Sequence, residues 1–269
     1  MDPGFFVSEG WTQIDAIADK TAMNAIIDAI YRDQRVELPQ GGAVNPFPVA
    51  IRRAEGDMLY RLVREVQPEA TLEVGTAWGL STLFICQALR DNARGRHTAI
   101  DPFQKKFHYA GLENVRRAGL GDLLSFVEEM SQTALARMVG EGRRFEVIFI
   151  DGGHLFDLAF VDFFFADQLV PVGGYLVFDD LWMPAVRKVL RFILRNRQYA
   201  IAEEFLGDRA PFVKRHLQNL KYQVRKRAKG RRSLGTGSEM DFHRGHNVNW
   251  CVLRKTGEDT REWDHFAPF

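Results

Sequence analysis

Acidic side chains end two of the buried, apolar runs in this sequence. "FEVIFID" (145–151) ends on Asp151, and "GYLVFDD" (174–180) ends on Asp179 and Asp180. Three carboxylates within a few ångströms of one another would repel unless they are protonated or hold a cation. Hard oxygen ligands with open positions suit Mg²⁺, which keeps several waters in its shell. We therefore predict a magnesium site at Asp151, Asp179 and Asp180.

A glycine-containing turn follows another apolar run that carries an acid. "LEVGTAWGLSTLFI" (72–85) is typical of a strand, a tight turn and a helix, with Glu73 before the turn and Gly75 and Gly79 within it. Glycine lets the backbone approach a ligand closely, and the helix that follows directs free N–H groups at that ligand. The spacing differs from the dinucleotide motif, and there is no Walker lysine. An acid beside the turn favours a cationic ligand group over a pyrophosphate.

Asp101, at the end of "HTAID" (97–101), extends this interpretation. In nucleotide-binding α/β folds an acid at such a position accepts hydrogen bonds from ribose hydroxyls. A nucleoside that carries positive charge in place of phosphate is S-adenosylmethionine. The sequence therefore indicates that ligand for the turn.

Strands and helices must alternate to position these acids. We predict helices over 12–35 and 50–66, and then five strands that are each followed by a helix. The predicted strands are 71–75, 97–101, 123–129, 145–151 and 174–180, and the helices are 79–91, 105–118, 131–140, 156–170 and 184–197. Two last strands, 199–205 and 247–255, lack a helical crossover, so we expect them to pair antiparallel at one edge. The predicted fold is α/β: a Rossmann-like, doubly wound, seven-stranded, mostly parallel sheet with helices on both faces.

Five segments taken together resemble a known family. "LEVGTAWGLST", "TAIDPF", "EEMSQTAL", "VIFIDGGH" and "GGYLVFDD" occur in the order found in class I S-adenosylmethionine-dependent methyltransferases. Within that family they are similar to the metal-dependent O-methyltransferases, of the catechol type and of secondary metabolism. The resemblance implies methyl transfer to a hydroxyl of a small molecule. It also implies cofactor contacts from Glu73, Gly75, Thr76, Ala77, Gly79, Ser81, Asp101, Ser131, Gln132 and Asp151. For Ser131 an ordinary helix N-cap is an equal interpretation.

The chain departs from this family pattern at the expected catalytic base. Catechol-type enzymes commonly carry a lysine just after the first aspartate, where this sequence has Gly152, Gly153 and His154. We predict His154 as the base, acting beside Asp151, because an unperturbed imidazole can accept a proton near neutral pH. His154 as a metal ligand or as a helix cap is the alternative.

Composition and charge set the broad class. The chain has 269 residues, 46% of them hydrophobic, and a formal net charge of +1. Its two cysteines form no disulfide framework, and no secretory leader or run of transmembrane length is evident, so we expect a cytoplasmic protein without a membrane span. We predict an N-terminal helical region (1–66) that shapes the substrate mouth or a homodimer contact. A methyltransferase domain (67–269) with a basic helical insertion (208–245) would follow.

The basic segment 214–232 within that insertion has three interpretations. It carries nine Lys or Arg residues and no acid. A solvated or dimer-facing helix, a lid over an acidic substrate, and a patch for nucleic acid or an anionic membrane all fit. With Tyr222 as the one aromatic side chain available for stacking, nucleic acid is not favoured.

Two other functions of the whole chain stay open. One is a metal-independent O- or N-methyltransferase with a histidine base, and the other is a non-catalytic cofactor-binding module with a nucleic-acid-binding helix.

Overall fold

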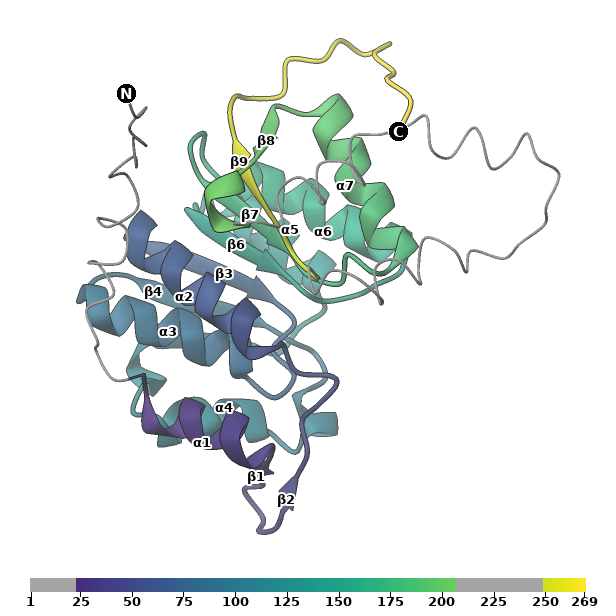
Figure 1. Cartoon of the computed structure of the whole chain (residues 1–269). Coiled ribbons are helices and arrows are strands. Elements are labelled where there is room, and N and C mark those ends of the chain that lie inside the picture. The colour runs from purple at the N-terminus through teal and green to yellow at the C-terminus, as the bar shows by residue number, and fades with distance from the viewer. Residues whose placement is uncertain (1–22, 207–248) are drawn as a thin grey trace, which may run out of the picture.

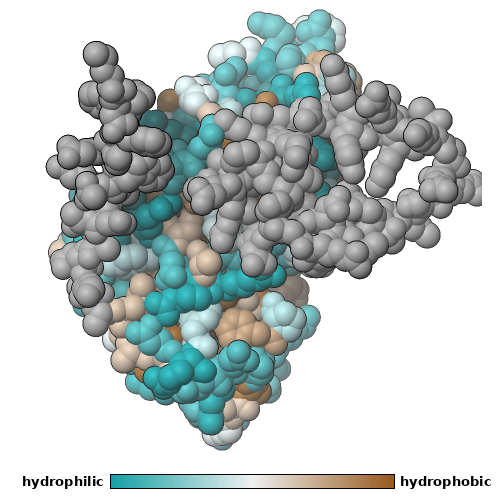
Figure 2. All heavy atoms as spheres, in the orientation of Figure 1, coloured by the Kyte–Doolittle hydropathy of each residue, from teal (hydrophilic) through white to brown (hydrophobic). Residues whose placement is uncertain are grey.

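The computed structural model describes residues 23–206 and 249–269. The start of the first predicted helix and the basic segment 214–232 lie outside these residues. The predicted insertion 208–245 also lies outside them. In the described part no helix combines the length and the apolar character needed to cross a bilayer. Hydrophilic side chains cover much of the face in Figure 2, with smaller hydrophobic areas between them.

A seven-stranded sheet forms the centre of the fold (Figure 1). Its strands are β3 (Ala70–Val74), β4 (Arg96–Ile100), β5 (Leu124–Val127), β6 (Val147–Ile150), β7 (Tyr175–Phe178), β8 (Tyr199–Ile201) and β9 (Cys251–Lys255). Their order is β5-β4-β3-β6-β7-β9-β8. The first five strands are parallel, whereas β9 pairs antiparallel with both β7 and β8. The predicted α/β fold is confirmed, with β8 rather than the antiparallel β9 at the edge.

Helices cover both faces of this sheet, as predicted. They are α1 (Ala25–Asp33), α2 (Arg53–Val66), α3 (Leu80–Asn92), α4 (Ala110–Arg117), α5 (Ser131–Gly140), α6 (Phe156–Leu169) and α7 (Pro184–Asn196). α2 packs on α3, and α6 packs on both α5 and α7 (Figure 1). The sheet centre is largely apolar. In β6 and β7 both faces carry buried apolar side chains (Ile148, Phe149, Leu176 and Val177), whereas β3 has the apolar Leu72 on one face and the buried polar Thr71 and Glu73 on the other.

In three places the observed elements differ from the predicted ones or add to them. The helix predicted at 105–118 is divided into a 3₁₀ turn (Gln104–Phe107) and α4, because His108 and Tyr109 adopt left-handed backbone angles. The strand predicted at 199–205 ends at β8 and continues as a 3₁₀ turn (Glu203–Phe205). Between the two predicted N-terminal helices the chain forms a small antiparallel hairpin of β1 (Val36–Glu37) and β2 (Ala43–Val44).

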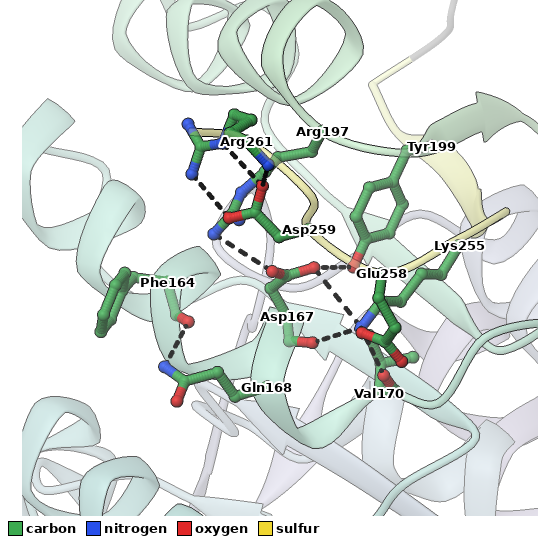
Figure 3. Close-up of polar contacts among 10 residues, drawn as sticks. All are labelled: Phe164, Asp167, Gln168, Val170, Arg197, Tyr199, Lys255, Glu258, Asp259 and Arg261. Carbon is green, nitrogen blue, oxygen red and sulfur yellow. Dashed lines mark hydrogen bonds and ion pairs between the residues drawn. The ribbon is translucent and has the colours of Figure 1, made fainter. Parts of the chain in front are cut away.

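The C-terminal residues return to the end of the sheet opposite the carboxyl ends of the parallel strands. Figure 3 shows Asp167 of α6 between Arg197, Tyr199 and Lys255. The Tyr199 hydroxyl donates to Asp167 Oδ1 at 2.7 Å, and the Arg197 guanidinium lies 3.1 Å from Oδ2. Lys255 Nζ donates to the Asp167 carbonyl oxygen at 2.8 Å. This cluster joins α6, the end of α7, β8 and β9, and so fixes the last strands against the parallel part of the sheet.

Candidate functional site

A cavity of about 770 Å³ opens at the carboxyl ends of β3, β4, β6 and β7. This is where a doubly wound sheet is expected to bind ligands, because the crossovers diverge there. Nine of the predicted site residues line it: Gly75, Ala77, Asp101, Ser131, Gln132, Asp151, His154, Asp179 and Asp180. The fold therefore brings together residues that follow five strands, β3 to β7, and lie far apart in the sequence.

The turn after β3 is held by one carboxylate. Asp101 Oδ2 accepts hydrogen bonds from the backbone N–H groups of Thr76 and Ala77 at 3.2 and 2.9 Å. The Gln104 side chain donates to the same oxygen at 2.9 Å, and the Phe103 N–H donates to Oδ1 at 2.7 Å. A carboxylate offers about four acceptor positions, two on each oxygen. Oδ1 of Asp101 therefore retains capacity for one further donor from the cavity.

Gly75 is required in this turn for steric reasons. Its φ is +93°, and a Cβ atom placed on it would lie 2.1 Å from the Asp151 carbonyl oxygen. The Gly75 N–H donates to the Ile100 carbonyl oxygen at 2.9 Å. The turn after β3 thus packs directly against the end of β6, which places the two parts of the cavity side by side.

Four of the predicted cofactor contacts lie behind the cavity wall. These are Glu73, Thr76, Gly79 and Ser81, none of which lines the cavity. Glu73 is fully buried, its Oε2 accepts the Thr82 hydroxyl at 2.5 Å, and it lies 3.4 Å from His97 Nε2. The side chain faces α3 rather than the turn, because successive residues of a strand point to opposite faces. Gly79 instead allows α3 to approach the start of α4, since a Cβ there would meet the Gly111 carbonyl oxygen at 2.6 Å.

Three side chains converge beyond the ends of β6 and β7. Asp151, His154 and Asp180 each offer one ligand atom, and these atoms lie within 4.8 Å of one another. His154 Nε2 is 2.6 Å from Asp180 Oδ2 and 3.5 Å from Asp151 Oδ1. The grouping differs from the predicted triad, because His154 rather than Asp179 completes it. Asp179 lines the cavity, but its Oδ1 accepts the Asp180 N–H and the Asn249 amide, at 2.8 and 2.7 Å.

Comparison with known proteins identifies the domain. Residues 72–181 match the family model of a methyltransferase domain. Over these residues the chain is similar to methyltransferase domains. The predicted resemblance to that family is confirmed.

Relatives and solved structures agree on the fold of this methyltransferase domain. The chain is 30% identical to a caffeoyl-CoA O-methyltransferase of Stellaria longipes over 47% of its own length, and 25% identical to a catechol O-methyltransferase of Mycobacterium tuberculosis over 62%. It spans 52% of the former and 71% of the latter, so about half the length of the plant relative is matched. An O-methyltransferase structure from Bacillus cereus superimposes with a TM-score of 0.55 at 18% identity, covering 70% of this chain and 86% of that one. One from Streptomyces achromogenes covers 91% and 95% with a TM-score of 0.50 at 18% identity.

The electrostatics of the methyltransferase domain change the expected role of His154. Hydrogen bonds to Asp151 and Asp180 raise the pKa of His154 to about 10. Burial raises the pKa of Asp151 to about 7, although the hydrogen bond to His154 opposes the shift. Burial alone would raise the pKa of Asp180, but its bonds to His154 lower it below the ordinary value. The raised pKa favours the imidazolium form of His154 at neutral pH, in contact with both carboxylates, and this form suits a hydrogen-bond donor better than the predicted base.

The donor set fits a divalent cation on one condition. Two carboxylates and one imidazole within 4.8 Å of one another are suitable ligands. An imidazole binds a metal only when it is neutral. The cluster would thus contain either a protonated His154 or a cation bound by Asp151, His154 and Asp180.

Two residues of the cavity wall carried no recognisable signal in the sequence. The side-chain amide of Asn249 donates a hydrogen bond to Asp179, which lies 70 residues earlier in the chain. This hydrogen bond depends on β9 lying beside β7. Glu55 reaches the cavity from the first turn of α2, where its Oε2 accepts the Arg52 N–H at 2.6 Å in a capping box. The sequence shows a glutamate near a helix start, but not that this helix end faces the strand ends.

Proposed function

We propose that the chain is an S-adenosylmethionine-dependent methyltransferase that methylates an oxygen of a small molecule. The observation that supports this most directly is one cavity that joins the turn held by Asp101 to the Asp151–His154–Asp180 cluster. The Bacillus cereus structure is a complex with S-adenosylhomocysteine, and the Streptomyces achromogenes structure is a complex with S-adenosylmethionine. The positions of these residues on the shared fold suit the same ligand.

The lining residues would divide between cofactor and acceptor. Oδ1 of Asp101 would accept a ribose hydroxyl, and Ser131 and Gln132 would flank the base at the β5 side of the cavity. The acceptor would then lie at the β6 and β7 side. Holding two reactants in line can lower the barrier by up to about 7–11 kcal/mol, which makes positioning the main contribution of such a site.

Asp151 is the proposed proton acceptor. Its pKa of about 7 suits proton transfer near neutral pH, whereas His154 already carries a proton. The acceptor oxygen forms a bond to the methyl carbon as the carbon–sulfur bond breaks. The sulfonium becomes a neutral thioether, and the hydroxyl proton passes to Asp151. In this mechanism the imidazolium of His154 orients the Asp151 carboxylate.

Magnesium assistance is a further part of the proposal. The relatives are named as catechol and caffeoyl-CoA O-methyltransferases. In this chain the ion would be held by Asp151, neutral His154 and Asp180. A bound divalent cation would favour the deprotonated acceptor oxygen. Transfer without metal, with Asp151 alone as the base, is the competing form of the same reaction.

The N-terminal region is proposed to shape the acceptor side. Residues 47–52, between the β1–β2 hairpin and α2, line the cavity. They supply apolar walls next to the carboxylates. Neither a homodimer contact nor the role of the basic segment 214–232 is tested by the described residues, and both stay predictions.

Calorimetry with S-adenosylhomocysteine tests the cofactor assignment. We expect saturable binding to the wild-type chain and at least a tenfold loss of affinity in Asp101→Asn, because one acceptor of the carboxylate becomes an amide donor. Asp122→Asn is the matched control, since that side chain is 66% exposed. Absence of binding to the wild-type chain would reject the proposal. Binding without methyl transfer to any hydroxylated aromatic compound would favour a non-catalytic module.

A further inference from the structure

The cavity extends beyond the Asp151–His154–Asp180 cluster to a second group of polar side chains. Glu55 from α2, Asp179 after β7 and Asn249 before β9 line this end, together with the rings of Phe47 and Trp182. We call these five residues the acceptor end. In the sheet order, β6 separates β3, which leads into the cofactor turn, from β7. The acceptor end therefore lies on the opposite side of Asp151 from the turn.

Glu55 has an oxygen that no described residue satisfies. The residue is 3% exposed, and its Oε2 accepts the Arg52 N–H, but Oε1 is buried without a hydrogen-bond partner. Leaving a buried acceptor unpaired costs about 1–3 kcal/mol, and more when the group is charged. Such an oxygen in a cavity wall indicates a donor that comes from a ligand.

Asp179 lies at the same end, with both of its donors on one oxygen. It is 6% exposed, and the Asp180 N–H and the Asn249 amide both reach Oδ1. The negative charges of Asp151 and Glu55 lie near it, and holding ionised carboxylates together costs free energy. A nearby positive charge would relieve this cost.

The charges that line the whole cavity are predominantly acidic. Among the residues that the structure describes, five carboxyl groups line it, at Glu55, Asp101, Asp151, Asp179 and Asp180, against the cationic side chains of Arg52 and His154. Asp101 accepts four hydrogen bonds, and Asp151 and Asp180 share His154. Of these five groups, Glu55 is the one with a buried oxygen that lacks a hydrogen-bond partner.

We propose that Glu55 and Asp179 bind a protonated amine carried by the acceptor, so that the substrate class is a hydroxylated aromatic or aliphatic amine. This inference rests on the proposed methyltransferase function and specifies its substrate. An ammonium group offers three donors, which suits two carboxylates and a flanking aromatic ring. Trp182 lines the same cavity, and its indole N–H donates to Oδ1 of Asp180, the residue that follows Asp179.

Two other ligand classes fit the acceptor end less well. A second divalent ion would need several converging ligand atoms, and the cluster that meets this requirement within the described residues excludes Glu55 and Asp179. Within the described part of the chain, an anionic acceptor, such as a thioester that carries phosphates, would face five carboxyl groups and the cations of Arg52 and His154. The caffeoyl-CoA relatives are named for a thioester of this kind, and the acidic lining of this cavity does not match such a substrate.

A set of three probes on one dihydroxyphenyl ring tests the inference: an arylethylamine, the corresponding arylethanol and the corresponding arylacetate. Their binding is measured by calorimetry to the full chain saturated with S-adenosylhomocysteine. We expect the amine to bind at least tenfold more tightly than the alcohol, and the carboxylate most weakly. In Glu55→Gln the affinity for the amine should fall roughly tenfold or more, as on removal of one member of a buried charged pair, with the alcohol unchanged.

The substitution is designed to leave the fold intact. Glutamine can replace glutamate in a capping box, so α2 keeps its N-terminal bonds. Glu65→Gln, on the exposed side of the same helix, is the matched control and should change none of the affinities. Equal binding of the amine and the alcohol, or no saturable binding of the amine to the wild-type complex, would overturn the inference while leaving the cofactor assignment standing.

One result would reassign Glu55 to the cofactor. S-adenosylhomocysteine carries an ammonium group of its own, and a loss of its binding in Glu55→Gln, with the probe affinities unchanged, would place that group at Glu55. This outcome rejects the acceptor amine. If S-adenosylhomocysteine fails to bind the wild-type chain, the proposed function fails first, which separates the two conclusions.

Discussion

His154 Nε2 lies 2.6 Å from Asp180 Oδ2, and this contact determines the protonation state of the site. From the sequence, a histidine three residues after the aspartate that ends a strand is a candidate general base. In the folded chain two carboxylates stabilise its charged form. In the proposed mechanism the role of proton acceptor therefore passes to Asp151, and His154 is its hydrogen-bond donor.

Titration of His154 should show a raised pKa. We expect its imidazole to lose a proton at about pH 10 in the folded chain, followed by NMR, against an unperturbed value near 6.5. Because the folded pKa is the higher one, the stabilisation is complete below about pH 6.5 and is lost as pH rises toward 10. In Asp180→Asn the midpoint should fall by more than one pH unit. A midpoint near 6.5 in the wild-type chain would disprove the arrangement.

Metal binding should displace the proton of His154. Adding MnCl₂ or MgCl₂ near neutral pH should release about one to two protons for each ion bound, one from His154 and a fraction from Asp151, and the affinity should rise with pH, because both ligands must be deprotonated first. Calorimetry in buffers of different ionisation enthalpy measures the released protons. Asp180→Asn should abolish binding, whereas Asp157→Asn, on the exposed start of α6, should not. Binding that is independent of pH would exclude His154 as a ligand.

Gly75→Ala should be strongly destabilising. The added Cβ would lie 2.1 Å from the Asp151 carbonyl oxygen, in addition to the strain of a positive φ. Gly142→Ala is a control for strain alone, because its φ is +69° and no atom lies within 4 Å of the added carbon. We expect a loss in the free energy of unfolding of about 1–2 kcal/mol for Gly142→Ala and a loss larger by at least about 2 kcal/mol for Gly75→Ala. Urea denaturation measures both, and equal losses would refute the steric argument.

Asp167→Ala should destabilise the chain without altering the cavity. The substitution removes the acceptor of the Tyr199 hydroxyl and one of the two acidic partners of both Arg197 and Lys255, whose side chains are 8% and 4% exposed; Asp259 and Glu258 remain as their other partners (Figure 3). Removing one member of a buried ion pair typically costs about 3–5 kcal/mol. Asp157→Ala, exposed on the same helix, should cost much less. A change in S-adenosylhomocysteine affinity at a temperature where the variant is folded would contradict a purely structural role.

Much of the candidate site follows from local sequence pattern. Strands of about five apolar residues, helices of period 3.6 and the acids after them depend on neighbours a few positions away, so Asp101, Asp151 and Asp180 could be assigned to one edge of a sheet before any coordinates. The side of the sheet on which Glu73 lies could not be assigned in this way. Side chains alternate along β3, but packing between distant segments decides which helix covers each face.

The sequence alone determined the class of fold, the glycine turn and the acids at the carboxyl ends of the strands, because each depends on short-range pattern. The tertiary structure alone decided which partner each acid has. Asp180 faces His154, Asp179 faces Asn249 from 70 residues further along the chain, and Glu55 reaches the cavity from a helix that precedes the first strand of the main sheet. Hydrogen bonds and charges act over a few ångströms, so the chemistry of these carboxylates is set by residues that only folding brings within that distance.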